Sequence, residues 1–115
     1  MSDERINAAV EASALIRQAQ ANGDHATLLR RGDSERGALL LVISSRGQHV
    51  ACLQRQLELS SGEYKWNPVG PKQSAGSAEI SEFLATQARF DPDLWQIELD
   101  IAEPERFIAE TSMSG

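Results

Sequence analysis

Two aspartates flank a proline in the segment Arg89-Phe90-Asp91-Pro92-Asp93-Leu94-Trp95. Carboxylates this close together could contribute to a cation site or act as an acid–base pair. Two aspartates alone make a poor calcium site, since calcium takes six to eight oxygen ligands. Aspartates in turns also accept hydrogen bonds from nearby backbone N–H groups. We therefore predict that Asp91 and Asp93 stabilise a rigid corner, with Phe90 and Trp95 entering the core on either side of it.

Arg30 and Arg31 stand before a loop that contains Gly32 and Gly37. Neighbouring strand residues point to opposite faces, so one guanidinium can pair with acidic groups while the other stays free for a phosphate-bearing ligand. The loop is not a nucleotide-phosphate loop, because it lacks the Gly-Lys-Ser/Thr ending and leads into a strand. The candidate binding residues are Arg30, Arg31, Asp91, Asp93 and Trp95.

His49 and Cys52 are the histidine and cysteine that lie closest together in the sequence. Three positions apart on a strand, they point to opposite faces and cannot hold one ion together. Cys52 lies among Val50, Ala51 and Leu53 with no activating neighbour, so we predict a packing role for it. The sequence gives no catalytic residues, no metal site and no cofactor site.

Length and charge limit the functions that the chain can have. Its 115 residues suit a single domain, residues 1–115, with a frayed tail from about residue 109. Residues 76–115 hold two basic and nine acidic side chains, which disfavours nucleic acid as a partner. A single cysteine and the absence of a signal peptide or a long apolar run predict a cytoplasmic protein that does not bind membranes.

The pattern of apolar residues predicts the elements that hold these side chains. Ser2 or Asp3 can cap a first helix that runs to about Asn22. One stripe of this helix, Ile6, Ala9, Val10, Ser13 and Ile16, is predicted to be buried. A second side with small residues, Ala8, Ala12, Leu15 and Ala19, would let the helix sit close to a sheet or a partner.

Four strands are predicted next, at residues 25–30, 38–43, 49–59 and 64–66, and short connections favour an antiparallel meander. The run Ala38 to Ile43 is entirely apolar, as in a central strand covered on both faces. Ser77 can cap a second helix with an inner face of Ile80, Phe83 and Leu84, and alternation from Trp95 to Ile101 predicts a last strand.

The predicted fold is therefore α+β, with a mostly antiparallel sheet of four to five strands and two helices, in the order α-β-β-β-β-α-β. The two helices are expected to cover one face of the sheet. The other face or an edge would then be left for solvent or a partner.

Three sets of residues resemble a known family. They are Arg30-Arg31-Gly32-Asp33 followed by Gly37-Ala38-Leu39-Leu40, an isolated Trp66, and Phe90 to Trp95 leading to Glu98. On these residues the chain resembles domain-of-unknown-function family 1491, a group of small uncharacterised bacterial proteins. The resemblance covers nearly the whole chain and implies no assigned activity, so it supplies no catalytic residues.

Two hypotheses about function follow. The first is a small, non-enzymatic protein-interaction module that binds another protein or a second copy of itself through a sheet edge or an acidic helix face. The alternative is a small-ligand-binding or enzymatic domain that uses Arg30, Asp91 and a pocket near Trp95.

Overall fold

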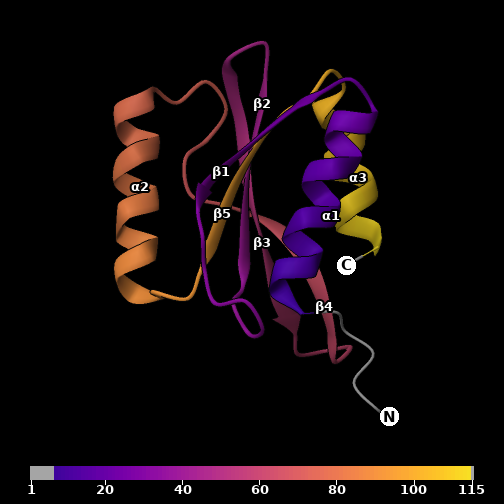
Figure 1. Cartoon of the computed structure of the whole chain (residues 1–115), viewed down its shortest axis with the longest axis vertical. Helices are drawn as coiled ribbons and strands as arrows, with labels where there is room; N and C mark the ends of the chain where they lie inside the picture. The colour runs from indigo at the N-terminus through magenta and orange to yellow at the C-terminus, as the bar shows by residue number, and fades with distance from the viewer. Residues whose placement is uncertain (1–6, 115) are drawn as a thin grey trace.

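The computed structural model describes residues 7–114, which form three layers with a sheet between helices on either side (Figure 1). The elements are α1 (Ala8–Ala21), β1 (His25–Arg30), β2 (Leu39–Ser45), β3 (Gln48–Glu58), β4 (Glu63–Val69), α2 (Ser77–Phe90), β5 (Trp95–Asp100) and α3 (Pro104–Ser114). This is an α+β fold, as predicted. It has three helices where the sequence predicted two.

The sheet has five strands in the order β1-β5-β2-β3-β4. Strands β2, β3 and β4 form the predicted antiparallel meander, but β1 does not join it. Instead β5 lies between β1 and β2, antiparallel to β1 and parallel to β2. The segment from β3 through α2 supplies the long crossover that a parallel pair requires. The sheet is therefore mixed, and the prediction of a four-strand meander was wrong.

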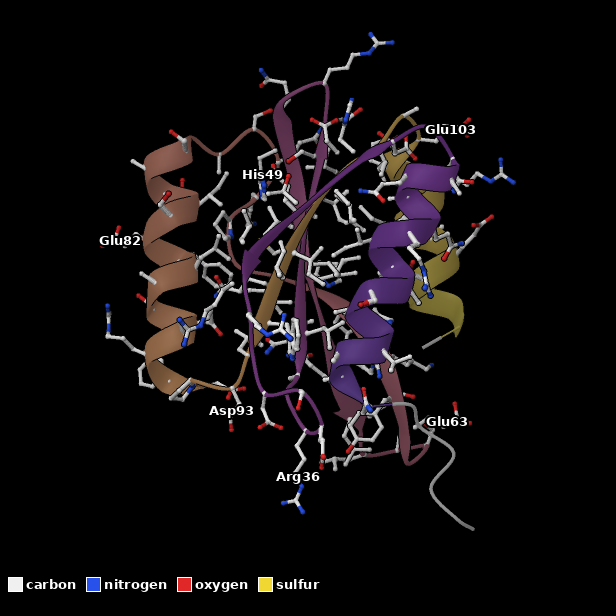
Figure 2. All side chains as sticks on the ribbon, in the orientation of Figure 1. Arg36, His49, Glu63, Glu82, Asp93 and Glu103 are labelled. Atoms are coloured by element: carbon white, nitrogen blue, oxygen red, sulfur yellow. The ribbon has the colours of Figure 1, made fainter. Side chains whose placement is uncertain are left out.

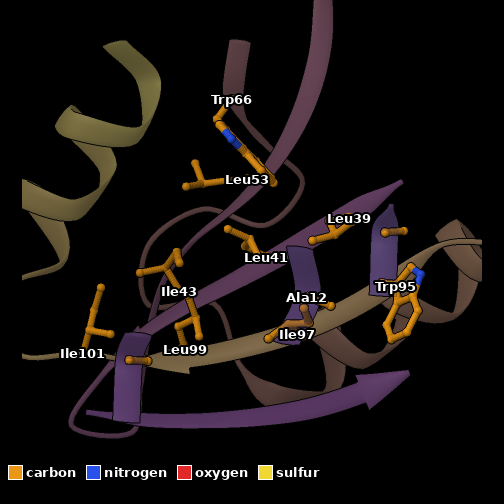
Figure 3. Close-up of a cluster of buried hydrophobic side chains, with 12 residues drawn as sticks. Ala12, Leu39, Leu41, Ile43, Leu53, Trp66, Trp95, Ile97, Leu99 and Ile101 are labelled. Atoms are coloured by element: carbon orange, nitrogen blue, oxygen red, sulfur yellow. The ribbon is translucent and has the colours of Figure 1, made fainter. Parts of the chain in front are cut away.

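Strand β2 is the centre of the sheet, as predicted from its continuous apolar run. Leu40, Leu41 and Ile43 are fully buried. Alternate residues of β2 belong to two separate cores. Leu41 and Ile43 belong to the core under α1 and α3 (Figure 3). Leu40 and Val42 face α2. The helices thus cover both faces, and the expectation that they share one face was wrong. What remains open at the sides of the sheet are its two edge strands, β1 and β4.

Helix α1 packs on the sheet through its small residues. The buried residues are Ala8, Ala12 and Ala19. Of the predicted stripe, Ala9 and Ile16 are partly buried against the same core, whereas Val10 is 47% exposed. The Asn7 side chain caps the helix by accepting from the Val10 N–H at 2.9 Å. The predicted caps Ser2 and Asp3, and the stripe residue Ile6, lie outside the described residues.

Helix α2 packs through Ile80, Phe83 and Leu84, the inner face predicted from the sequence. Its N-cap is Gly76 rather than Ser77, without a side-chain hydrogen bond. No residue of α2 is fully buried. Phe90, the last residue of α2, was expected to enter the core but is 83% exposed, so this prediction was wrong.

Two predicted boundaries need correction. Strand β4 extends to Val69 and includes Pro68, whose missing N–H is tolerated because β4 is an edge strand. The predicted tail is helical, since α3 starts at Pro104, a residue well suited to a first helical position, and continues to Ser114. Phe107 and Ile108 of α3 pack on the core beside α1. Among residues 7–114, no helix is both long and apolar enough to cross a membrane.

The central position of β2 gives a first testable prediction. We expect Leu41→Ala to lower the free energy of unfolding by about 2–5 kcal/mol, because it leaves a cavity in a core that is fully enclosed. Leu59→Ala is the control: Leu59 is 88% exposed, and its loss should cost at most about 0.5 kcal/mol. Urea denaturation measures both. Equal losses in the two variants would contradict the burial of β2.

The buried cysteine gives a second prediction. Cys52 is fully buried, and burial raises the pKa of its thiol from 9.0 to about 11. The unfolded chain therefore loses the thiol proton at a lower pH than the folded protein does. We expect the stability of the wild type to fall, relative to Cys52→Ala, as the pH rises from 9 towards 11. A thiol reagent should label native Cys52 slowly at pH 7. Labelling at the rate of an exposed thiol would refute the packing role.

Candidate functional site

The predicted binding residues come together where the loop after β1 meets the corner before β5. We call this the loop–corner junction, residues 30–37 and 91–95. Arg30 Nη2 donates to the Pro92 carbonyl oxygen at 3.0 Å. The Asp33 N–H donates to the Asp93 carbonyl at 3.0 Å. The indole Nε1 of Trp95 donates back to the Asp33 carbonyl at 2.7 Å. Sequence reasoning thus selected residues that the fold does bring together.

Two glycines make the close approach in this junction possible. A Cβ on Gly32 would lie 2.2 Å from the Asp93 carbonyl oxygen, and one on Gly37 would lie 2.3 Å from the same atom. Both would also press on Cδ1 of Trp95, at 2.6 and 2.8 Å. The Trp95 ring is 2% exposed, and Arg31 lies over it with 5.3 Å from its guanidinium carbon to the ring centroid. The ring is enclosed by the protein itself.

The carboxylates of the junction accept hydrogen bonds from backbone N–H groups or point to solvent. Asp91 Oδ1 accepts from the Asp93 N–H at 3.2 Å, as predicted for a turn. Asp93 projects away from the fold at the outside of the corner (Figure 2). Asp33, which is part of the family motif but was not a candidate binding residue, accepts from the N–H groups of Arg36 and Glu35 at 2.7 and 3.1 Å. These bonds, that of Arg36 first, lower the pKa of Asp33. The bonds of Asp33 and Asp91 therefore stabilise the turn of the segment to which each belongs.

A second polar cluster lies under α2, on the other side of the sheet from α1. Ser44 donates to Glu98 Oε2 at 3.0 Å, linking β2 to β5. The buried His49 holds the loop before α2, since its Nε2 donates to the Pro71 carbonyl oxygen at 3.1 Å. Cys52 also lies on the α2 side, because the register shift in the β2–β3 pairing adds one residue to β3 between them, so the prediction that His49 and Cys52 point to opposite faces was wrong. In the described part of the chain, no group of three or more His, Cys, Asp or Glu side chains is placed to hold a metal ion.

Arg55 carries a partly buried positive charge, and the sequence analysis did not single it out. It lies over the ring of Trp66, 4.7 Å from the centroid, and pairs with Glu11 of α1. Its position could have been inferred, because residues two apart on a strand point to the same face and Arg55 follows the buried Leu53 by two positions in β3. The contact ties α1 to the meander.

A hollow between α1 and α3, here called the α1–α3 cavity, has a volume of about 420 Å³. Sequence reasoning also missed it, because its walls come from segments far apart in the chain. Its lining residues come from α1, the turn after α1, the end of β5 and α3: Leu15, Gln18, Ala19, Asn22, Asp24, Leu99, Ile101, Ala102, Glu103, Arg106, Phe107 and Glu110. None of the predicted binding residues lines it.

The outer edge of β1 is the most apolar edge of the sheet. In Figure 1 the sheet is seen nearly edge-on, and β1 crosses in front of the other strands, with α2 on one side and α1 on the other. Leu28 and Leu29 of β1 are 41% and 42% exposed. Within residues 7–114, β1 pairs with β5 on one side only.

The loop–corner junction gives a third prediction. We expect Gly37→Ala to lower the free energy of unfolding by about 1–3 kcal/mol, because its Cβ would force the loop away from Asp93 and Trp95. Gly76→Ser is the control: a Cβ there meets no atom within 4 Å, and serine is a good N-cap for α2. Thermal denaturation compares the two. If Gly37→Ala were as stable as the wild type, the junction would not be tightly packed.

Three solved structures resemble this fold. The crystal structure of a DUF1491 family protein from Caulobacter crescentus CB15 aligns with a TM-score of 0.73 and 28% identity, covering 84% of this chain and 89% of that one. An NMR structure of a DUF1491 family protein from the same organism gives 0.72 and 28%, covering 86% and 88%. The solution structure of protein Atu0922 from A. tumefaciens gives 0.70 and 24%, also over 86% and 88%, and supports the fold alone.

No protein with a curated description matches the chain. The family profile described as "Protein of unknown function (DUF1491)" matches residues 6–109, which include β1, the loop–corner junction and most of α3. This match covers nearly the whole chain and confirms the resemblance seen in its sequence. The chain belongs to the DUF1491 family.

Proposed function

We propose that this protein is a non-enzymatic interaction module that binds an extended segment of a partner protein along the outer edge of β1. The observation that carries the proposal is the open, apolar edge of β1. Edge strands present unpaired backbone groups that can add a further strand, and this is a common mode of peptide recognition. The single cysteine, which cannot form an internal disulfide, supports a cytoplasmic location for this interaction.

The two edges of the sheet differ in how well they are protected against pairing. Strand β4 carries Lys65 and Pro68, two residue types that block the addition of a strand. Strand β1 has neither, and residues His25 to Leu29 include no acidic side chain. Its one protective feature is a register shift between Leu28 and Arg30, which limits regular pairing to the first part of the strand. The β1 edge is thus the better site for an added strand.

Further groups at one end of β1 could anchor a partner. Arg30 bonds the carbonyl of Pro92, so the end of β1 lies beside the corner that follows α2. Phe90, two residues before Pro92, is 83% exposed, and exposed aromatic residues are common anchors in interfaces. Asp93 adds an outward carboxylate at this corner (Figure 2). These groups suit a partner segment with alternating aliphatic side chains and a basic residue at one end.

The alternative, a ligand site built from Arg30, Asp91 and a pocket near Trp95, has less support. Arg30 is bonded to a backbone carbonyl, Asp91 to a backbone N–H, and the ring of Trp95 is enclosed. A ligand would have to displace contacts that hold the loop–corner junction together.

The test compares Leu28→Lys with Leu59→Lys, the same change at an exposed leucine outside the β1 edge. Tagged wild type and both variants are expressed in the native host, and the proteins bound to each are quantified by mass spectrometry. We expect a partner retained by the wild type and by Leu59→Lys but lost with Leu28→Lys, because a lysine at the edge disfavours strand addition. Amide exchange should show that residues 25–28 become protected when the partner binds.

Unchanged melting temperatures would show that both variants fold. Equal retention of the partner by all three proteins would refute the role of the β1 edge. If the retained protein is a second copy of this chain, as light scattering would reveal, the module is a homodimer formed through β1.

A further inference from the structure

We propose that the α1–α3 cavity is a binding site for a small organic cation, a molecule with an apolar body and an ammonium group. This site lies on the α1 side of the sheet and does not involve the outer edge of β1. The inference is therefore independent of the interaction proposed above.

The floor of the cavity is apolar. Leu99, near the end of β5, and Ile101, which directly follows β5, form this floor, and both are buried. Leu15 and Ala19 of α1 stand on one side, and Phe107 of α3 stands on the other. Because Ala19 is small, it leaves space above β5 that Phe107 does not fill. A volume of about 420 Å³ falls within the range of small-molecule sites, which are mostly apolar with a few polar groups.

The rim of the cavity is acidic. It holds three carboxylates, those of Asp24, Glu103 and Glu110, and one cation, Arg106, for a net charge of −2. Arg106 is already engaged: its Nε donates to Glu110 Oε2 at 3.1 Å, and its Nη1 lies 3.7 Å from Glu103. The bond to Glu110 is the main reason why the pKa of Arg106 is raised. The same contacts engage Glu110 and Glu103, so Asp24 is the rim carboxylate that lies outside this ion-paired group, and the rim as a whole keeps its net charge of −2.

The backbone adds negative potential at the same place. Helix α1 ends at the cavity, with Ala19 and Asn22 among the lining residues. The C-terminal end of a helix carries partial negative charge, and α1 has no basic residue in its last turn to offset it. The positive N-terminal end of α3 is offset by Glu105 in its first turn and by the adjacent Glu103. Side chains and helix ends therefore favour a cation.

The position of one rim carboxylate is fixed. Asp24 Oδ1 accepts from the Ala102 N–H at 3.1 Å, which holds the turn after α1 against the end of β5. This bond fixes the position of the Asp24 carboxylate relative to the apolar floor. A ligand that fits places its hydrophobic group on Leu99 and Ile101 and its ammonium group at the rim. An anion of the same shape meets carboxylates there instead.

The experiment uses two probes of similar shape and opposite charge, phenethylammonium and 3-phenylpropionate, titrated into the full chain and followed by amide NMR shifts. We expect phenethylammonium to shift amides around the cavity, such as Asn22, Ala102 and Glu103, and to bind at least fivefold more tightly than 3-phenylpropionate. Added salt should weaken its binding, because the rim is exposed to solvent. Equal affinity for both probes, or shifts confined to other parts of the protein, would overturn the proposal.

A double variant tests the role of the rim. Asp24→Asn with Glu103→Gln removes two charges, and the asparagine retains an oxygen that can accept from the Ala102 N–H. We expect it to weaken phenethylammonium binding by about threefold to tenfold without lowering the melting temperature. Glu82→Gln is the control, since Glu82 projects from the outer side of α2, across the sheet from the cavity (Figure 2). If the double variant bound as tightly as Glu82→Gln, the acidic rim would have no role and the proposal would fail.

Discussion

Strand β5 is fixed between β1 and β2 by backbone pairing on both sides, and the hydrogen bond from the Trp95 indole to the Asp33 carbonyl closes this arrangement at the start of β5. This bond joins the loop that follows β1 to the first residue of β5, 62 positions later in the chain. The Asp33 N–H returns a bond to Asp93, and Gly32 and Gly37 leave room for the ring. Removal of the buried polar contact would leave an unpaired N–H in an enclosed position, which proteins rarely tolerate.

The insertion of β5 gives the two faces of the sheet different characters. On the face covered by α1 and α3, strands β2 and β5 present aliphatic side chains, and alanines of α1 approach them closely. On the α2 face, Ser44, His49 and Glu98 interrupt a smaller apolar cluster. Helix α2 accordingly has no fully buried residue and is held by a few side chains such as Phe83, together with a bond from Gln96 to the Leu84 carbonyl. The first face supplies most of the core, and the second carries polar links between strands.

The surfaces open to partners follow from the same layout. Helices cover both faces of the sheet, so its edges are what remains open. A partner strand pairs with the backbone of an edge strand, and β1 is the less protected of the two edges. The α1–α3 cavity arises because α1 and α3 share one face without filling the space at the end of β5. The edge proposed to bind a partner and the cavity proposed to bind a ligand are therefore separate surfaces of this chain.

The sequence by itself determined the local features of this protein. The apolar run around Leu41 predicted a doubly covered strand, alternation from Trp95 predicted β5, and the proline at position 92 predicted the corner. These features depend on neighbouring residues, whose periodicity and backbone restrictions act over a few positions. The family could also be recognised from short groups of residues.

Only the tertiary structure decided how these elements combine. The place of β5 between β1 and β2 depends on contacts between residues 62 positions apart, which leave no periodic signal in the sequence. The burial of Ala8, Ala12 and Ala19 with Val10 left exposed, and the exposure of Phe90, depend on how α1 and α2 are oriented on the sheet. The same is true of the site: sequence grouped Arg30, Asp91 and Trp95, but packing made them a structural junction and left the β1 edge and the α1–α3 cavity open.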